Sequence, residues 1–476
     1  MVELNTAPTL TVREIRLYER DVVLRLPFRF GVVTLTEAPQ CFARVRVGLA
    51  DGREAWGFAA EMLAPKWFDK NLALSNEDNF EQLRQALAIV GAAYVAHGAK
   101  TAFGHFADHY EAQIAAGRDN GLEPLVAGFG PALVDRAVLD GLCRAMQVSF
   151  YDAVRGNLAG IRGDVLTPDL AGFDLPEFLG GLQPPNVIHA RHTVGMVDPL
   201  AENPTPVGDG LPETLSEIIE HYGIRYFKVK VGGDREADLD RLSAIARLLD
   251  QIDDPYYVTL DGNEQYADQD GVLALWQDIL GNPRLARFAG SIIMIEQPIA
   301  RSLALTTDID RLAAERPVII DESDGEIDAF PRARALGYLG VSSKSCKGLY
   351  KSILNAARCR HWNDEAGAER YFMSGEDLTT QAGVAVQQDL ALAGLIGIAH
   401  VERNGHHYVN GMSGISEREQ QDFVAAHPDL YHRSDGVTRL LIRNGEIAVG
   451  SLQRPGFAVG AEPEWSAMRP TGAWSA

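Results

Sequence analysis

The stretch YFKVKVGGDREADLDRLSAIARLLDQIDDPYYVTLDGNE, residues 226–264, decides the class of fold. It begins with a short apolar run and continues with an amphipathic segment, READLDRLSAIARLL, whose apolar residues recur at helical spacing. A second apolar run, YYVTLDGNE, closes it. A strand, a helix and another strand in immediate succession are typical of a β-α-β unit, so this stretch predicts a parallel sheet covered by helices.

The same alternation extends over residues 187–434. Amphipathic segments such as ETLSEIIEHY and SILNAARCRHW separate short apolar runs. Eight such units predict a closed (β/α)8-type barrel. The expected strands are VIHARHTVG, YFKVKVG, YYVTLDGNE, IIMIEQPI, PVIIDES, LGVSSKS, RYFMSGE and IAHVERN.

The regions that flank this alternation have a different pattern. Residues 11–60 alternate apolar and polar side chains, which predicts antiparallel strands joined by a loop around residues 29–39. Residues 78–160 have helical periodicity, residues 161–186 are rich in Gly, Pro and Asp, and strand-like sequence resumes near residue 435. The expected division is an N-terminal α+β region (1–160), a barrel (187–434) and a C-terminal segment (435–476).

Composition excludes some classes of function. The chain has 44 Lys and Arg against 65 Asp and Glu, a net charge of −21, whereas nucleic-acid binding needs a basic surface. We see neither a signal peptide nor an apolar run long enough to span a bilayer, so no membrane partner is expected. The four cysteines are scattered, as free thiols of a reducing cytoplasm would be, and we expect a cytoplasmic protein.

Charged residues gather where the expected barrel strands end. Side chains two apart on a strand share one face, and catalytic residues of α/β barrels come from the carboxyl ends of the strands. Three successive strands each end in a carboxylate, and strands that end in lysine flank them on both sides. In chain order these residues are Lys228 and Lys230, Asp261 and Asn263, Glu296, Asp321 and Glu322, and Lys344.

The residue types indicate the chemistry. Asp261, Glu296 and Asp321 would repel one another without a cation, and a hard divalent ion, most simply Mg²⁺ or else Mn²⁺, takes such oxygen ligands. A lysine near that cation loses proton affinity and can act as a base. Lys230 is the expected base, and Lys228 on the same face would hold a negative oxygen or depress the pKa of its neighbour; spacing alone leaves open which of these two does which. Lys344 is expected on the opposite side of a bound substrate.

These residues resemble a known family. The K-x-K pair, the carboxylates in I-E-Q-P and D-E-S, and the lysine at strand six are similar to the enolase superfamily, of the mandelate racemase and muconate lactonizing enzyme type. The resemblance implies a modified (β/α)7β barrel of TIM type, with an α+β capping domain formed by the N-terminal region and the C-terminal tail. It also implies symmetric homo-oligomers. At strand eight, HVERNGHHY replaces the D-x-D of dipeptide epimerases.

The resemblance also assigns roles. Lys230 and Lys344 would be the acid/base pair, Lys228 would assist the substrate carboxylate, and Asn263 and Glu322 would support the metal ligands. Position at the cap or at strands seven and eight makes further residues candidates for substrate contact, although a structural histidine is an equal reading of His400. These candidates are Arg29, Ser374, His400 and Glu402.

The expected function is removal of the proton α to the carboxylate of a small acid, through an enediolate. Return of a proton by the opposite lysine gives racemisation or epimerisation, and loss of a leaving group gives cycloisomerisation. Dehydration of an acid sugar is the alternative within the family. A Schiff-base aldolase would leave the three carboxylates unexplained, and a binding protein that turns nothing over would not need two opposed lysines.

Overall fold

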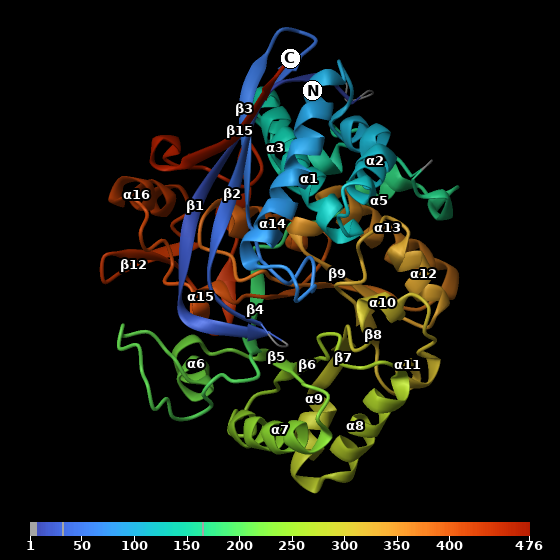
Figure 1. Ribbon diagram of the computed structural model, residues 1–476, viewed down its shortest axis with the longest axis vertical. Helices are drawn as coiled ribbons and strands as arrows, with labels where there is room; N and C mark the ends of the chain where they lie inside the picture. Colours follow the sequence, from blue (N-terminus) through green and yellow to red (C-terminus); the bar gives the residue numbers. More distant parts are fainter. Residues whose placement is uncertain (1–6, 31–32, 164–165) are drawn as a thin grey trace.

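The computed structural model describes residues 7–30, 33–163 and 166–476. A barrel lies below a cap in Figure 1, and both termini of the drawn chain lie at the cap. No helix in the described ranges is long and apolar enough to cross a membrane.

The barrel closes through eight parallel strands, as the alternation predicts. Each strand pairs with the next along the chain, and the last pairs with the first. The fold is thus the expected TIM-type barrel with a capping domain. The strands are β4 (Val187–Val194), β5 (Tyr226–Lys230), β6 (Tyr257–Asp261), β7 (Ile292–Glu296), β8 (Val318–Ile320), β9 (Gly340–Ser343), β10 (Phe372–Gly375) and β11 (His400–Glu402).

Helices connect successive barrel strands, and seven connections join the eight strands. These helices are α6 (Leu215–Tyr222), α7 (Arg235–Leu249), α8 (Gln269–Gly281), α9 (Ala286–Ser291), α10 (Arg301–Ala304), α11 (Asp310–Glu315), α12 (Ala329–Ala335), α13 (Leu349–Ala366) and α14 (Val384–Leu395). The short helix α15 (Gly405–Tyr408) and α16 (Glu417–Ala426) follow the last strand.

Strand alternation explains the two lysines of β5. Phe227 and Val229 are fully buried in the apolar core, so Lys228 and Lys230 share the opposite face. In the ladder, Lys230 pairs with Asp261, and Asp261 pairs with Glu296. The register therefore brings lysine and carboxylates to one level at the carboxyl end of the barrel.

The cap is an antiparallel sheet covered by helices. Its strands are β1 (Leu10–Phe30), β2 (Val33–Leu49), β3 (Glu54–Met62) and β15 (Arg469–Ser475), and its helices are α1 (Asn76–Ala96), α2 (Ala102–Asp119), α3 (Pro124–Met146) and α4 (Phe150–Arg155). α3 lies against β3 at close range: a Cβ on Gly57 would lie 2.1 Å from the Gly141 amide nitrogen. Only glycine leaves room for this approach.

The expected loop at 29–39 is corrected. β1 and β2 form a long hairpin in which Phe28 pairs with Leu35, so most of this segment is strand. Residues 31–32 lie outside the described residues. These residues form strands because the ladder gives hydrogen-bond partners to backbone N–H and C=O groups that a loop would leave to water.

The remaining segments link the two parts. Residues 168–181 hold a short 3₁₀ turn and α5 (Leu175–Gly181). After a hairpin of β12 (Tyr431–Ser434) and β13 (Val437–Leu440), β14 (Glu446–Ala448) pairs antiparallel with β4 of the barrel. β15 then pairs with β1, so the C-terminal tail belongs to the cap sheet.

Candidate active site

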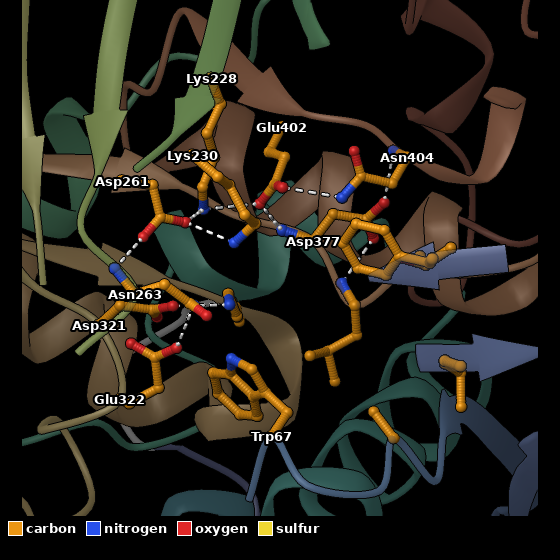
Figure 2. A pocket seen from close by; sticks show the side chains of 16 residues that line it. Trp67, Lys228, Lys230, Asp261, Asn263, Asp321, Glu322, Asp377, Glu402 and Asn404 are labelled. Carbon is orange, nitrogen blue, oxygen red and sulfur yellow. Dashed lines mark hydrogen bonds and ion pairs between the residues drawn. The ribbon is translucent and has the colours of Figure 1, made fainter. Parts of the chain in front are cut away.

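A pocket of about 440 Å³ lies at the carboxyl end of the barrel strands (Figure 2). The cap supplies part of its wall, through Phe28 of β1, Leu35 of β2, and Ala64 and Trp67 after β3. The barrel supplies the charged part, which consists of Lys228, Lys230, Asp261, Asn263, Asp321, Glu322, Lys344, Asp377, Glu402 and Asn404. The structure thus collects most of the residues that the sequence singles out.

Lys228 lies deepest among the three lysines, with 2% of its side chain exposed. Its Nζ lies 2.7 Å from Glu296 Oε1 and 3.1 Å from Asp261 Oδ2. Two carboxylates of the last strands also contact it, Glu376 Oε2 at 2.9 Å and Glu402 Oε2 at 3.2 Å. Burial alone would lower the pKa of Lys228, but these carboxylates outweigh it and raise the pKa well above the ordinary value. Lys228 is therefore a fixed cation.

Lys230 and Lys344 face the pocket from opposite sides. Lys230 extends from β5 and lies with Nζ 2.7 Å from Asp261 Oδ2. Lys344 follows β9, four strands further round the barrel, with Nζ 2.7 Å from Asp321 Oδ2 and 4.1 Å from the centre of the Trp67 ring. Burial opposes the charged form of Lys344, yet Asp321 raises the pKa of its ammonium group. Each lysine is thus paired with one of the predicted metal ligands.

The supporting residues lie where the resemblance implies. The Asn263 backbone N–H donates to Asp261 Oδ1 at 2.7 Å, and its side-chain Nδ2 donates to Glu322 Oε1 at 3.3 Å. Burial and the nearby Asp321 raise the pKa of Glu322. These contacts join the ends of β6 and β8.

The donor chemistry suits a hard divalent cation. Glu296 Oε2, Glu322 Oε2 and Asn263 Oδ1 are buried oxygen atoms without a hydrogen-bond partner among the described residues. Oxygen donors of this kind are what Mg²⁺ and Mn²⁺ prefer. The geometry of the site suits a metal ion less well than its chemistry does. Among the described residues, no three His, Cys, Asp or Glu side chains are grouped so as to hold a metal ion. The lysines contact the oxygen atoms that such a site would use.

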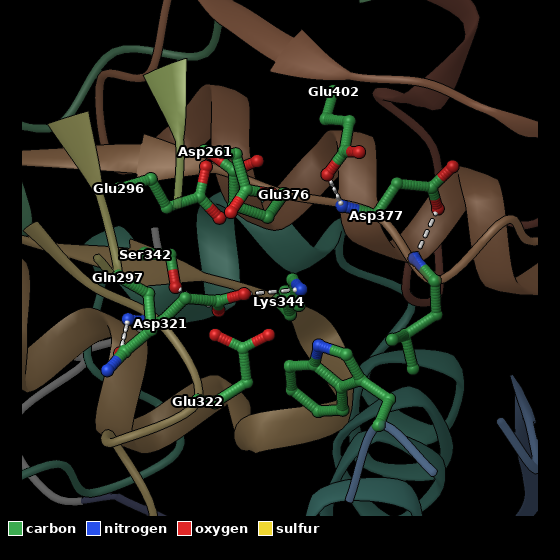
Figure 3. A network of polar contacts seen from close by, with 12 residues as sticks. Asp261, Glu296, Gln297, Asp321, Glu322, Ser342, Lys344, Glu376, Asp377 and Glu402 are labelled. Atoms are coloured by element: carbon green, nitrogen blue, oxygen red, sulfur yellow. Dashed lines mark hydrogen bonds and ion pairs between the residues drawn. The ribbon is translucent and has the colours of Figure 1, made fainter. Parts of the chain in front are cut away.

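Asp321 is held by groups that sequence reasoning did not find (Figure 3). Ser342 Oγ donates to its carboxylate, and Gln297 Oε1 accepts from its backbone N–H at 2.7 Å. Lys347 Nζ lies 3.3 Å from Asp321 Oδ1, with 1% of its side chain exposed. Lys347 is thus a further lysine buried in the site. Burial alone would raise the pKa of Asp321, but the ammonium groups of Lys344 and Lys347 lower it.

Arg191 and Glu376 complete the charged interior and were also missed. Arg191, on β4, pairs with the Glu376 carboxylate and donates from Nη2 to the Gly375 carbonyl at 2.6 Å. Glu376 follows β10 directly, the place that Asp321 occupies after β8, so the strand-end rule could have found it. Arg191 lies inside a strand, where no end signal marks it.

The expected substrate contacts divide. Glu402 lines the pocket, and its Oε1 accepts from Asn404 Nδ2 at 2.7 Å. Arg29 is exposed and does not line the pocket, because it alternates with Phe28 on β1 and takes the other face. Ser374 is buried beside Arg191, its hydroxyl donating to Glu376 Oε1 at 2.6 Å. His400 begins β11 and bonds Arg191 Nη1 through Nδ1 at 3.0 Å. Arg29, Ser374 and His400 are thus not among the residues that line this pocket.

Known proteins resemble this chain in part of its sequence and in its fold. No family model matches the chain. An L-Lys-D/L-Arg epimerase of Methylococcus capsulatus is 37% identical over 158 residues, which are 31% of this chain and 40% of the relative. The match thus spans less than half the length of that curated relative.

Solved structures match over nearly the whole chain. A muconate lactonizing enzyme of Mycobacterium smegmatis, complexed with muconolactone, has a TM-score of 0.58 at 18% identity, over 97% of this chain and 100% of that one. A 2-chloromuconate cycloisomerase of Rhodococcus opacus has a TM-score of 0.56 at 18% identity, over 95% and 97%. The chain therefore has the fold of the enolase superfamily, of the mandelate racemase and muconate lactonizing enzyme type.

Proposed function

We propose that this protein removes the proton α to the carboxylate of a small acid. The enediolate then regains a proton, as in a racemase or an epimerase, or expels a β-leaving group, as in a cycloisomerase. The observation that carries the proposal is the placement of Lys230 and Lys344 on strands four apart, both facing one pocket. A binding site for a carboxylate needs one cation, not two that face each other across the ligand.

The chain's own residues suit the proton transfers. A substrate between the two lysines presents one face of its α-carbon to each. The Nζ of one lysine, when neutral, takes the α-proton, and the electron pair of the broken C–H bond moves into the carboxylate. The opposite ammonium group then gives its proton to the other face of the carbon. Transfer of this kind by a positioned side chain contributes about 10²–10⁴-fold to a rate.

The charge of the enediolate needs compensation. Asp261, Glu296 and Asp321 are the residues that would hold Mg²⁺ or Mn²⁺, which supplies a Lewis acid for the substrate carboxylate. Lys228 keeps its proton in the surrounding carboxylates, so it contributes fixed positive charge at the floor of the pocket. Trp67 and the cap residues above it exclude water from the reacting carbon.

Dehydration of an acid sugar is the second candidate. It uses the same first step, followed by loss of a hydroxyl group β to the carboxylate. The acidic and amide groups on one side of the pocket, Glu402, Asp377 and Asn404, could bond sugar hydroxyls. A Schiff-base aldolase agrees less well, because that chemistry needs no metal and leaves Asp261, Glu296 and Asp321 without a role.

Hydrogen–deuterium exchange tests the proposal. The full chain is incubated with Mg²⁺ in D₂O and pools of amino-acid derivatives, dipeptides, acid sugars and lactone precursors, and α-protons are followed by NMR. We expect loss of an α-proton signal in one pool, which EDTA stops and added Mg²⁺ restores. Exchange that continues in EDTA would overturn the role of the metal. Trapping of a carbonyl substrate by borohydride would favour the aldolase.

A further inference from the structure

A second cavity, of about 910 Å³, lies beside the candidate active site. It is enclosed by α6 and the loop before it, α14, α15 and the β12–β13 hairpin. In Figure 1, α6, α15 and β12 lie on the left side of the barrel, and α14 lies nearer the middle of the view. The cavity is about twice the size of the catalytic pocket, and nothing in the proposed reaction uses it.

Buried nitrogen atoms without partners line this cavity. Arg403 Nε and both ring nitrogens of His406 are buried and make no hydrogen bond to any described residue. One nitrogen of a neutral imidazole carries an N–H. Arg439 bonds Asn410 Oδ1 from Nε at 3.0 Å and the Ser434 carbonyl from Nη1 at 2.6 Å, and its Nη1 lies 4.0 Å from Asp435 Oδ2. Buried polar groups are almost always paired, so several unpaired ones at one cavity indicate a missing acceptor.

The lining offers N–H groups and two cations, in a protein whose net charge is −21. The cations are Arg403 and Arg439, and the histidines are His221, His406 and His432. Burial lowers the pKa of His406 to about 3, so its neutral ring contributes an N–H donor rather than charge. The two acids of the lining offer little to a ligand. Asp377 is engaged by Arg403 at 3.3 Å and by the Asn404 N–H at 2.9 Å, and the Asp435 side chain is 85% exposed. The cavity therefore favours an anion.

The rest of the wall is apolar. Tyr222, Val386 and Leu440 are buried side chains of three different elements, and all line the cavity. A ligand that satisfies both parts of the wall carries one acidic group and an apolar body. A bare inorganic ion would leave the apolar wall in contact with water.

We infer that this cavity is a second binding site, for a small organic carboxylate with an apolar body. The carboxylate accepts hydrogen bonds from Arg439 and His406, and the apolar body lies against Val386 and Leu440. Asp377 lines both cavities, and its backbone N–H donates to Glu402 Oε2 of the catalytic pocket at 3.0 Å. The second site thus adjoins the catalytic wall but is built from different side chains.

Binding of 4-fluorobenzoate, followed by ¹⁹F NMR, tests the inference. All proteins carry Lys230→Ala and Lys344→Ala, so that carboxylate binding by the catalytic lysines does not contribute. We expect saturable binding that Arg439→Gln weakens at least about tenfold, because the substitution removes a charge-assisted hydrogen bond. Val386→Phe, which fills the cavity and leaves its charges in place, should weaken binding as well.

Matched controls separate the site from general charge effects. Arg433→Gln removes a nearby arginine of β12 that does not line the cavity, and it should leave binding unchanged. The cation 4-fluorobenzylamine, with the same ring, should not bind. Equal binding by the parent, Arg439→Gln and Val386→Phe proteins would overturn the inference. So would the absence of binding to the parent, which carries Lys230→Ala and Lys344→Ala. Because catalysis plays no part, either result is independent of the proposed reaction.

Discussion

The two ends of the barrel interior differ in chemistry although the same strands build both. At the amino end the inward side chains are rings: Tyr226 stacks on Tyr257 at 4.9 Å and on His400 at 4.5 Å, and lies 5.2 Å from His189. At the carboxyl end they are lysines and carboxylates. Along β5 one face passes from Tyr226 through Lys228 to Lys230.

This difference separates closing the barrel from supporting chemistry. Stacked rings fill space and satisfy few polar groups, so they stabilise the fold without holding any reactive group. The ionic end pays desolvation for every charge and recovers it only through close opposite charges. Lys228 lies between the two layers, and it is where stability and function should be coupled most strongly.

The largest effect is expected at the ionic end. Lys344→Ala should lower the rate of α-proton exchange about 10²–10⁴-fold for the epimer whose α-proton Lys344 removes, because it deletes that proton-transfer group. The rate is measured by NMR in D₂O with the substrate from the exchange screen. Tyr257→Phe, at the aromatic end, is the control and should keep the rate. A comparable loss of exchange rate in Lys344→Ala and Tyr257→Phe would contradict the distinction between the ionic and the aromatic end of the barrel.

Lys228→Met should lower the free energy of unfolding by roughly 3–5 kcal/mol, since it leaves four buried carboxylates without their shared cation. Urea unfolding followed by circular dichroism measures it, and exchange activity should fall in the same variant. Tyr226→Leu, two residues earlier on the same face, should lose stability but keep activity. A stable Lys228→Met protein would contradict the coupling.

Lowering the pH should reduce the free energy of unfolding through His400, which lies at the aromatic end. Burial, Arg191 and His189 lower the pKa of His400 to about 3. The unfolded chain binds this proton below about pH 6.5 whereas the folded protein does not, so the contribution to stability is present above pH 6.5 and is lost as the pH falls. This histidine alone should cost about 2 kcal/mol at pH 5. Urea unfolding at pH 7 and pH 5 measures the loss, and His400→Gln should reduce it; an unchanged pH dependence would count against this assignment.

The smallest effect is expected at Arg29. Its side chain lies on the exposed face of the cap hairpin, so Arg29→Ala should change the exchange rate less than about twofold and stability by less than about 0.5 kcal/mol. Kinetics at saturating substrate and a thermal melt measure both. A large rise in KM would indicate that Arg29 contacts the substrate, and it would contradict the described position of Arg29 on the exposed face of the hairpin.

Much of the fold could be predicted from sequence because parallel strands and their helices leave periodic patterns. All eight barrel strands lie within the predicted runs. The two antiparallel strands on either side of residues 29–39 were predicted, but the loop between them was drawn too long, since the extent of a ladder depends on a partner strand that local sequence does not identify. Pairing over long sequence distances is not encoded locally.

The candidate site divides in the same way. Strand ends bring Lys230, Asp261, Asp321 and Lys344 to one pocket, because position after an apolar run is a local signal. Lys347 and Arg191 depend on contacts across the barrel interior. For these residues the sequence carries no local mark, and only the closed barrel shows what they contact.

The central claim is that two lysines act on opposite faces of one carbon. Once an exchanging substrate is known, each of its two epimers is incubated in D₂O with Lys230→Ala and with Lys344→Ala, and the α-proton is followed. We predict that each variant still exchanges one epimer, a different one in each case, and that neither interconverts them. Exchange of both epimers by either variant at the rate of the unmodified protein would contradict the account.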